Sequence, residues 1–88
     1  MKTYKLNIYG QVQGVFFRVS TQEIAQSLQI TGWVQNNTNG TVEILASGED
    51  AALTQFINWC YNGPPMAQVK SIQKMPQTPR PYKNFEIR

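Results

Sequence analysis

Apolar and polar residues alternate at the start of the chain and then change to helical spacing. Residues 3–9 read TYKLNIY, which places one tyrosine, the leucine and the isoleucine on the same face of an extended strand. After the turn, one face of an amphipathic helix that runs to about Leu28 is indicated by the spacing of Phe17, Thr21, Ile24, Ala25 and Leu28. The pattern therefore predicts a strand, a turn over residues 10–18, and a helix.

A second strand is predicted at residues 30–37, and a hairpin follows it. Asn39-Gly40 is a strong signal for a tight hairpin turn, so residues 41–46 should form a third strand antiparallel to the second. Residues 47–50 then turn the chain into a second helix. The apolar face expected for this helix contains Leu53, Phe56, Ile57 and Cys60.

The fourth predicted strand, residues 67–74, has an irregular pattern. Val69 and Ile72 fall on opposite faces of a regular strand, which indicates either a bulge or a frayed end. Residues 75–81 contain three prolines and are expected to form a loop.

A short last strand is expected at residues 82–87, with Phe85 and Ile87 pointing inward. The complete order is β-α-β-β-α-β with one terminal strand added. This order is typical of the α+β, ferredoxin-like split β-α-β-β-α-β sandwich, an antiparallel sheet with two helices on one face. Residues 1–88 are long enough for a single domain with one modest core.

Composition excludes several kinds of chemistry. The chain has no histidine, which removes the usual general base, the commonest metal ligand and the Ser-His and Cys-His nucleophile pairs. Its one cysteine, Cys60, excludes an internal disulfide and is expected to be core filler. The five carboxylates are scattered, apart from Glu49 and Asp50 at a helix start, so we expect no metal.

Nothing in the sequence indicates a membrane segment or an export signal. No apolar run is long enough to span a bilayer, and no charged-then-apolar leader opens the chain. The single cysteine also fits a reducing compartment. We therefore expect a cytoplasmic protein without a membrane partner.

The turn at residues 10–18 has the features of an anion site. Gly10 and Gly14 let the backbone approach a ligand closely, and successive N–H groups that run into a helix N-terminus form an anion-binding concavity. Arg18 adds a planar fork of donors, and it is the only cationic residue between Lys5 and Lys70. The alternative is plain turn chemistry with a solvated arginine. The net charge of +3 favours anionic partners only weakly.

Asn36 has two interpretations, because it precedes the hairpin turn. Its amide can brace the hairpin, or it can orient a water beside an anion bound at the first turn, although an amide cannot deprotonate that water. Ser20, Thr21 and Thr38 are weaker candidates for anion binding. Residues 20–23 also have capping-box spacing, but they fit equally well inside a helix that begins at Arg18.

Two motifs of the chain resemble the acylphosphatase family. The run GQVQGVFFR at residues 10–18 looks like the first signature of that family, and GWVQNNTNGTV at residues 32–42, continuing to Gly48, looks like the second. The element order and the length also match over the whole chain.

The resemblance implies an acylphosphate phosphohydrolase. Such an enzyme cleaves the carboxyl–phosphate bond of a small acyl phosphate, without metal or cofactor, to give a carboxylate and inorganic phosphate. By the same resemblance, Asn36 positions the attacking water, and the phosphate of the substrate takes the proton of that water. The phosphate would be bound by the Arg18 side chain and by the turn amides of Gln13, Gly14, Val15, Phe16, Phe17 and Arg18.

Two other functions are compatible with the fold. RNA-recognition domains share this topology, but they carry aromatic residues on both central strands, and residues 41–46 have none. A sensing or docking domain would keep the anion site and lose catalysis, against which stands the joint presence of Arg18 and Asn36. The basic residues also lie near the chain ends and not across the sheet, so we expect no nucleic-acid partner. We expect a monomer, because the proline-rich loop and the short last strand limit edge pairing.

Overall fold

The computed structural model covers residues 1–88 and contains two helices and five strands in the predicted order. Neither helix is long and apolar enough to cross a bilayer. The elements are β1 (Lys2–Gln11), α1 (Phe17–Ser27), β2 (Thr31–Asn36), β3 (Val42–Gly48), α2 (Asp50–Asn62), β4 (Gln68–Gln77) and β5 (Phe85–Ile87).

The strands form one sheet in the order β4-β1-β3-β2-β5. Four of them pair antiparallel, as expected, but β5 pairs parallel to β2. The reason lies in the connection over residues 78–84. β4 ends at the same end of the sheet where β2 begins, and the chain crosses that end to the opposite edge, so β5 must start beside the start of β2.

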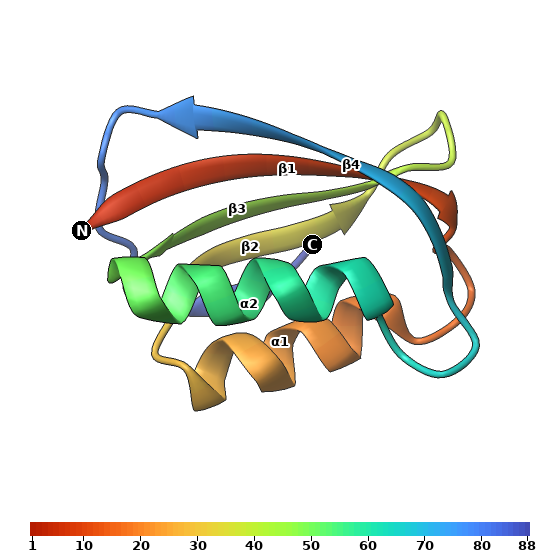
Figure 1. The fold of residues 1–88 in the computed structure, drawn as a ribbon, viewed down its shortest axis with the longest axis horizontal. Coiled ribbons are helices and arrows are strands. Elements are labelled where there is room, and N and C mark those ends of the chain that lie inside the picture. Colours follow the sequence, from red (N-terminus) through yellow and green to blue (C-terminus); the bar gives the residue numbers. More distant parts are fainter.

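Both helices cover the same face of the sheet, and the core lies between them and the strands (Figure 1). Leu6 and Ile8 of β1 are fully buried there, which confirms the face predicted for the first strand. On α2, Leu53, Phe56 and Cys60 are buried and Ile57 is half-buried, so the predicted apolar face is confirmed as well. The split β-α-β-β-α-β fold thus leaves the other face of the sheet without a covering helix.

The irregular pattern of the fourth strand is a bulge. Tyr9 pairs with Ser71, and the next residue of β1, Gly10, pairs with Val69, so Lys70 is the extra residue. The bulge restores the side-chain alternation, and Val69 and Ile72 both pack against the core.

Two details near the end of the chain differ from the prediction. The expected loop at residues 75–81 is shorter, because β4 continues through Pro76 to Gln77. Proline is tolerated there because β4 is an edge strand, which does not need every N–H group for pairing. Phe85 is buried in the core, as predicted, whereas Ile87 is 39% exposed, because β5 is the opposite edge and has a neighbouring strand on one side only.

Replacing Gly32 with alanine is expected to destabilise the protein by about 2–3 kcal/mol. A Cβ atom at Gly32 would lie 1.8 Å from the main-chain oxygen of Leu45, and the φ angle of +137° strains any other residue. Gly40 is the matched control, since its φ is +91° but an added Cβ meets nothing within 4 Å. Urea unfolding of both variants measures the difference. Equal losses of unfolding free energy in the two variants would show that the contact between the added Cβ and the main-chain oxygen of Leu45 does not contribute to the destabilisation.

Candidate active site

A pocket of about 260 Å³ brings the two predicted site residues together. Sheet pairing explains this arrangement, because Ile8 and Asn36 both pair with Val42 from opposite sides of β3. The end of β2 therefore lies beside the turn that follows β1. The pocket is lined by Val12, Gly14, Phe16, Phe17, Arg18, Val19 and Asn36.

The backbone of the turn presents unpaired N–H groups. Residues 13–16 lie outside every helix and strand, and none of their N–H groups donates a hydrogen bond to the protein. Gly14 and Phe16 have positive φ angles of 73° and 64°, which is unusual for phenylalanine. The helix begins at Phe17 without a side-chain cap, so its first N–H groups also have no helical partner. This is the backbone geometry of an anion site.

The start of α1 at Phe17 settles the interpretation of residues 20–23, which lie inside the helix and form no capping box. The hydroxyl of Thr21 is buried and donates to the main-chain oxygen of Phe17 at 2.7 Å. The hydroxyl of Thr21, one of the weaker candidates for anion binding, is therefore not available to an anion in the pocket. Ser20 and Thr38 do not line the pocket.

Arg18 lies in the first turn of α1 and opens on the pocket. Its Nη1 donates to the main-chain oxygen of Arg88 at 3.0 Å, and the guanidinium forms no ion pair with any carboxylate. The contact with Arg88 holds the side chain in place while the other N–H groups remain available. Sequence reasoning gave no role to the main chain of Arg88.

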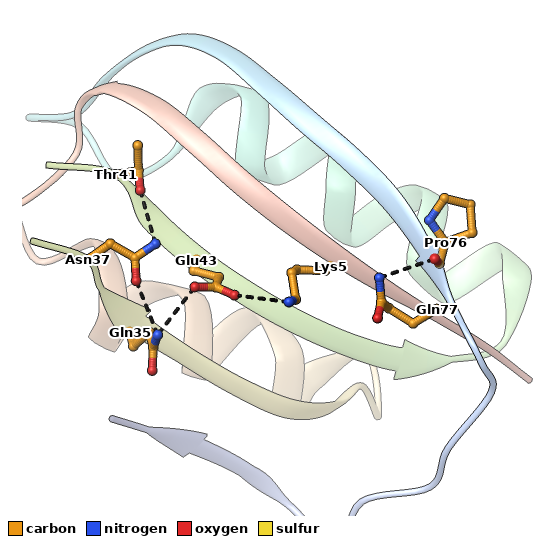
Figure 2. Close-up of polar contacts among 7 residues, drawn as sticks. All are labelled: Lys5, Gln35, Asn37, Thr41, Glu43, Pro76 and Gln77. Carbon is orange, nitrogen blue, oxygen red and sulfur yellow. Dashed lines mark hydrogen bonds and ion pairs between the residues drawn. The ribbon is translucent and has the colours of Figure 1, made fainter. Parts of the chain in front are cut away.

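The Asn36 side chain makes no hydrogen bond within the protein, although its neighbours do. Asn37 donates to the hydroxyl of Thr41 at 3.1 Å (Figure 2), and Asn39 accepts hydrogen bonds from the N–H and the hydroxyl of Thr41. These two asparagines brace the hairpin, so the geometry does not support that role for Asn36. Asn36 instead lines the pocket together with Arg18.

Gln13 and Val15 are the two predicted turn residues that do not line the pocket. The Gln13 side chain turns to the hairpin, where its Nε2 donates to the main-chain oxygens of Asn37 at 2.7 Å and Thr41 at 2.9 Å. It thus ties the anion-binding turn to the hairpin that follows Asn36. No local pattern in the sequence indicates this contact, because the partners lie 24 and 28 residues away.

The pocket contains no side chain that acts as a base near neutral pH. Arg18 is the only ionisable residue in its lining, so all five carboxylates lie elsewhere. Cys60 is fully buried in the core, where burial raises the pKa of its thiol. No three histidine, cysteine, aspartate or glutamate side chains lie close enough together to hold a metal ion.

Comparisons with known proteins agree on one family. The acylphosphatase family model matches residues 4–87. The chain is 43% identical to the acylphosphatase of Rubrobacter xylanophilus over 72 residues, which span 82% of this chain and 66% of that one. It is 41% identical to the acylphosphatase of Thiobacillus denitrificans over 88 residues, 100% and 98% of the two chains.

A solved structure supports the same assignment. The acylphosphatase of Coxiella burnetii superimposes with a TM-score of 0.95 and 37% sequence identity, over 99% of this chain and 92% of that one. The order of elements, the match of the family model along almost the whole chain and the identity to these relatives lead to one conclusion. The chain belongs to the acylphosphatase family.

Proposed function

We propose that residues 1–88 act as one catalytic domain, in which the Arg18 side chain and the turn amides bind the phosphate of an acyl phosphate and Asn36 orients the attacking water. Membership of the family makes the chain an acylphosphatase, a hydrolase of acyl phosphates. The observation that carries the assignment of roles is the single pocket on which Arg18, Asn36 and a turn with unpaired N–H groups all open.

Phosphate binding is the role proposed for the turn and Arg18. Gly14, Phe16 and Phe17 line the pocket, and the positive φ angles at two of them curve the backbone around it. The N-terminus of α1 adds its positive dipole end, and Arg18 adds planar donors that match phosphoryl oxygens. We also assign the amides of Gln13 and Val15 to this group, as members of the same turn. The donors are in place before substrate arrives, so charge on the transferring phosphoryl group is stabilised without reorganisation.

Asn36 is proposed to hold the water that attacks phosphorus. Its amide can donate and accept hydrogen bonds, so it can orient a water, but it has no useful basicity. The substrate phosphate takes the proton, since the pocket offers no other acceptor of suitable pKa. The bond from phosphorus to the acyl oxygen then breaks, and the carboxylate leaves with the bonding electrons. A carboxylate is a good leaving group, so positioning and charge stabilisation supply the catalysis.

The proposed reaction requires no metal and no cofactor. The partners proposed for the protein are an acyl phosphate and inorganic phosphate. We further propose that the protein acts in the cytoplasm as a monomer and binds no nucleic acid. Pro76 within the edge strand β4 supports the monomer, because proline cannot donate to an added strand.

Loss of benzoyl phosphate, followed by ultraviolet absorbance in EDTA, tests the proposed activity. We expect steady hydrolysis that EDTA leaves unchanged, with competitive inhibition by inorganic phosphate. Phosphate binding without any turnover would instead indicate a sensing or docking domain.

Gln13→Glu is expected to lower turnover by about tenfold while phosphate inhibition changes little. The carboxylate keeps the length of the side chain but faces the oxygens of Asn37 and Thr41, so two hydrogen bonds are replaced by repulsion. The hairpin and Asn36 then lose their fixed position relative to the bound phosphate. Turnover and the inhibition constant of phosphate are measured with benzoyl phosphate.

Gln11→Glu is the matched control, because it makes the same charge change at an exposed residue of β1 without a side-chain hydrogen bond. Turnover should stay near that of the unmodified chain. An equal fall in both variants would assign the effect to charge and remove the positioning role of Gln13.

A further inference from the structure

A second pocket lies on the face of the sheet that neither helix covers. It has a volume of about 480 Å³ and shares no residue with the active-site pocket. Figure 2 looks onto this face, with Lys5 near its centre and the chain beyond Gln77 running past the end of the sheet toward β5. Three cationic side chains line this pocket together with two aromatic rings: Lys5, Arg80 and Arg88 with Trp33 and Tyr82.

Buried hydroxyl groups fix the loop that carries Arg80. The Arg80 N–H donates to Thr3 Oγ1 at 3.0 Å, and the Arg80 main-chain oxygen accepts from Ser47 Oγ at 2.8 Å. Thr3 and Ser47 are only 3% and 1% exposed, and their hydroxyls lie 2.6 Å apart. The backbone of Arg80 is therefore held over the end of the sheet by contacts that do not involve its side chain.

Aromatic rings orient the two arginines. The guanidinium carbon of Arg80 lies 5.5 Å from the ring centre of Tyr82, and that of Arg88 lies 4.7 Å from the ring centre of Trp33. A guanidinium that lies over a ring keeps its N–H edge free for an oxyanion. Neither side chain forms an ion pair or a hydrogen bond with the protein. The guanidinium N–H groups of both arginines therefore remain available to bind an oxyanion.

Nearby carboxylates do not neutralise these arginines. Glu43 pairs with Lys5 at 3.5 Å and accepts from Gln35, as Figure 2 shows. Glu86 is the register partner of Trp33, but it does not line the pocket and forms no ion pair. The pocket thus combines two unpaired guanidinium groups with a volume that suits a small molecule.

We propose that this pocket binds a dianionic phosphate group, either as free phosphate or as the phosphate ester of a small molecule. Arginine forks match the oxygens of phosphate, and two of them balance its charge. The arginines already lie over Trp33 and Tyr82, so an RNA base that stacked on the same ring faces would have to displace them.

To test the proposal, the full chain is titrated with inorganic phosphate and, in a second experiment, with glycerol phosphate. Nitrogen–proton correlation NMR spectra are recorded at each step of both titrations. The indole N–H of Trp33 reports the second pocket and the Gly14 amide reports the active site. We expect saturable shifts at Trp33 with their own midpoint. Shifts with phosphate alone assign the site to the free ion, and shifts with both ligands assign it to phosphate esters as well.

Arg80→Gln is expected to weaken the binding reported by Trp33 at least about tenfold, while Gly14 shifts and benzoyl phosphate turnover stay unchanged. Lys83→Gln is the matched control, because it removes the same charge from the same loop at a residue outside the pocket. Arg88 is unsuitable for this comparison, since its main chain contacts Arg18. Equal weakening by both variants, or the absence of a saturable Trp33 shift, would overturn the proposal.

Discussion

Replacing Arg18 with alanine is expected to slow the hydrolysis of benzoyl phosphate by at least about 10²–10³-fold, the effect of removing one transition-state donor. Arg18 is the only cationic side chain in the pocket, so no neighbour can take over its charge. Because it binds the phosphate in both the ground state and the transition state, inhibition by inorganic phosphate should weaken as well. Steady-state kinetics with benzoyl phosphate and phosphate inhibition measure both effects.

Two controls accompany the Arg18 variant. Arg18→Lys keeps the charge but loses the planar fork, so its rate should fall between those of the alanine variant and the unmodified chain. Lys70→Ala removes a cation from the bulge of β4, away from the pocket, and should leave the rate unchanged. A loss below about threefold in Arg18→Ala would contradict the proposed role, because a single transition-state donor is worth far more.

Asn36→Ala is expected to lower turnover by about 10²-fold while the affinity for phosphate stays nearly constant. The Asn36 side chain has no hydrogen bond within the protein, so removing it costs little folding stability. Its proposed partner is the water, which is absent from the complex with product phosphate in this account. The turnover number and the phosphate inhibition constant, measured in the same assay, separate the two effects.

Thr38→Ala is the control for the hairpin, because Thr38 is exposed on the same turn and does not line the pocket. It should leave both constants unchanged. A comparable loss of phosphate affinity in the Asn36 and Arg18 variants would contradict the division between a residue that binds phosphate and one that orients water.

Much of the fold follows from local patterns in the sequence. Alternation over residues 3–9, helical spacing after Phe17 and the Asn39-Gly40 turn each depend on neighbours a few positions away, and all three features are present. The direction of β5 is not local, since it depends on the chain crossing from one edge of the sheet to the other over residues 78–84. The extension of β4 through Pro76 likewise depends on the position of β4 at the edge of the sheet. That position cannot be predicted from the neighbouring residues in the sequence.

In the candidate site, too, some features could be predicted from the sequence and others depend on tertiary contacts. The placement of Arg18 and Asn36 in one pocket was expected, because the motif positions and the split fold together bring the first turn beside the end of the second strand. The side-chain contacts of Gln13 and the main-chain contact of Arg88 were not predicted from the sequence. These contacts join residues 24 to 70 positions apart and depend on final side-chain geometry, which has no periodic signal.

The most direct measurement follows the fate of oxygen when benzoyl phosphate is hydrolysed in water enriched in heavy oxygen, with the uncatalysed reaction subtracted. Mass spectrometry of the two products shows which atom the water attacked. An Asn36-held water that attacks phosphorus places the heavy oxygen in inorganic phosphate and none in benzoate. Heavy oxygen in benzoate would mean attack at the carbonyl carbon, and it would contradict the central claim that the pocket directs water to a bound phosphate.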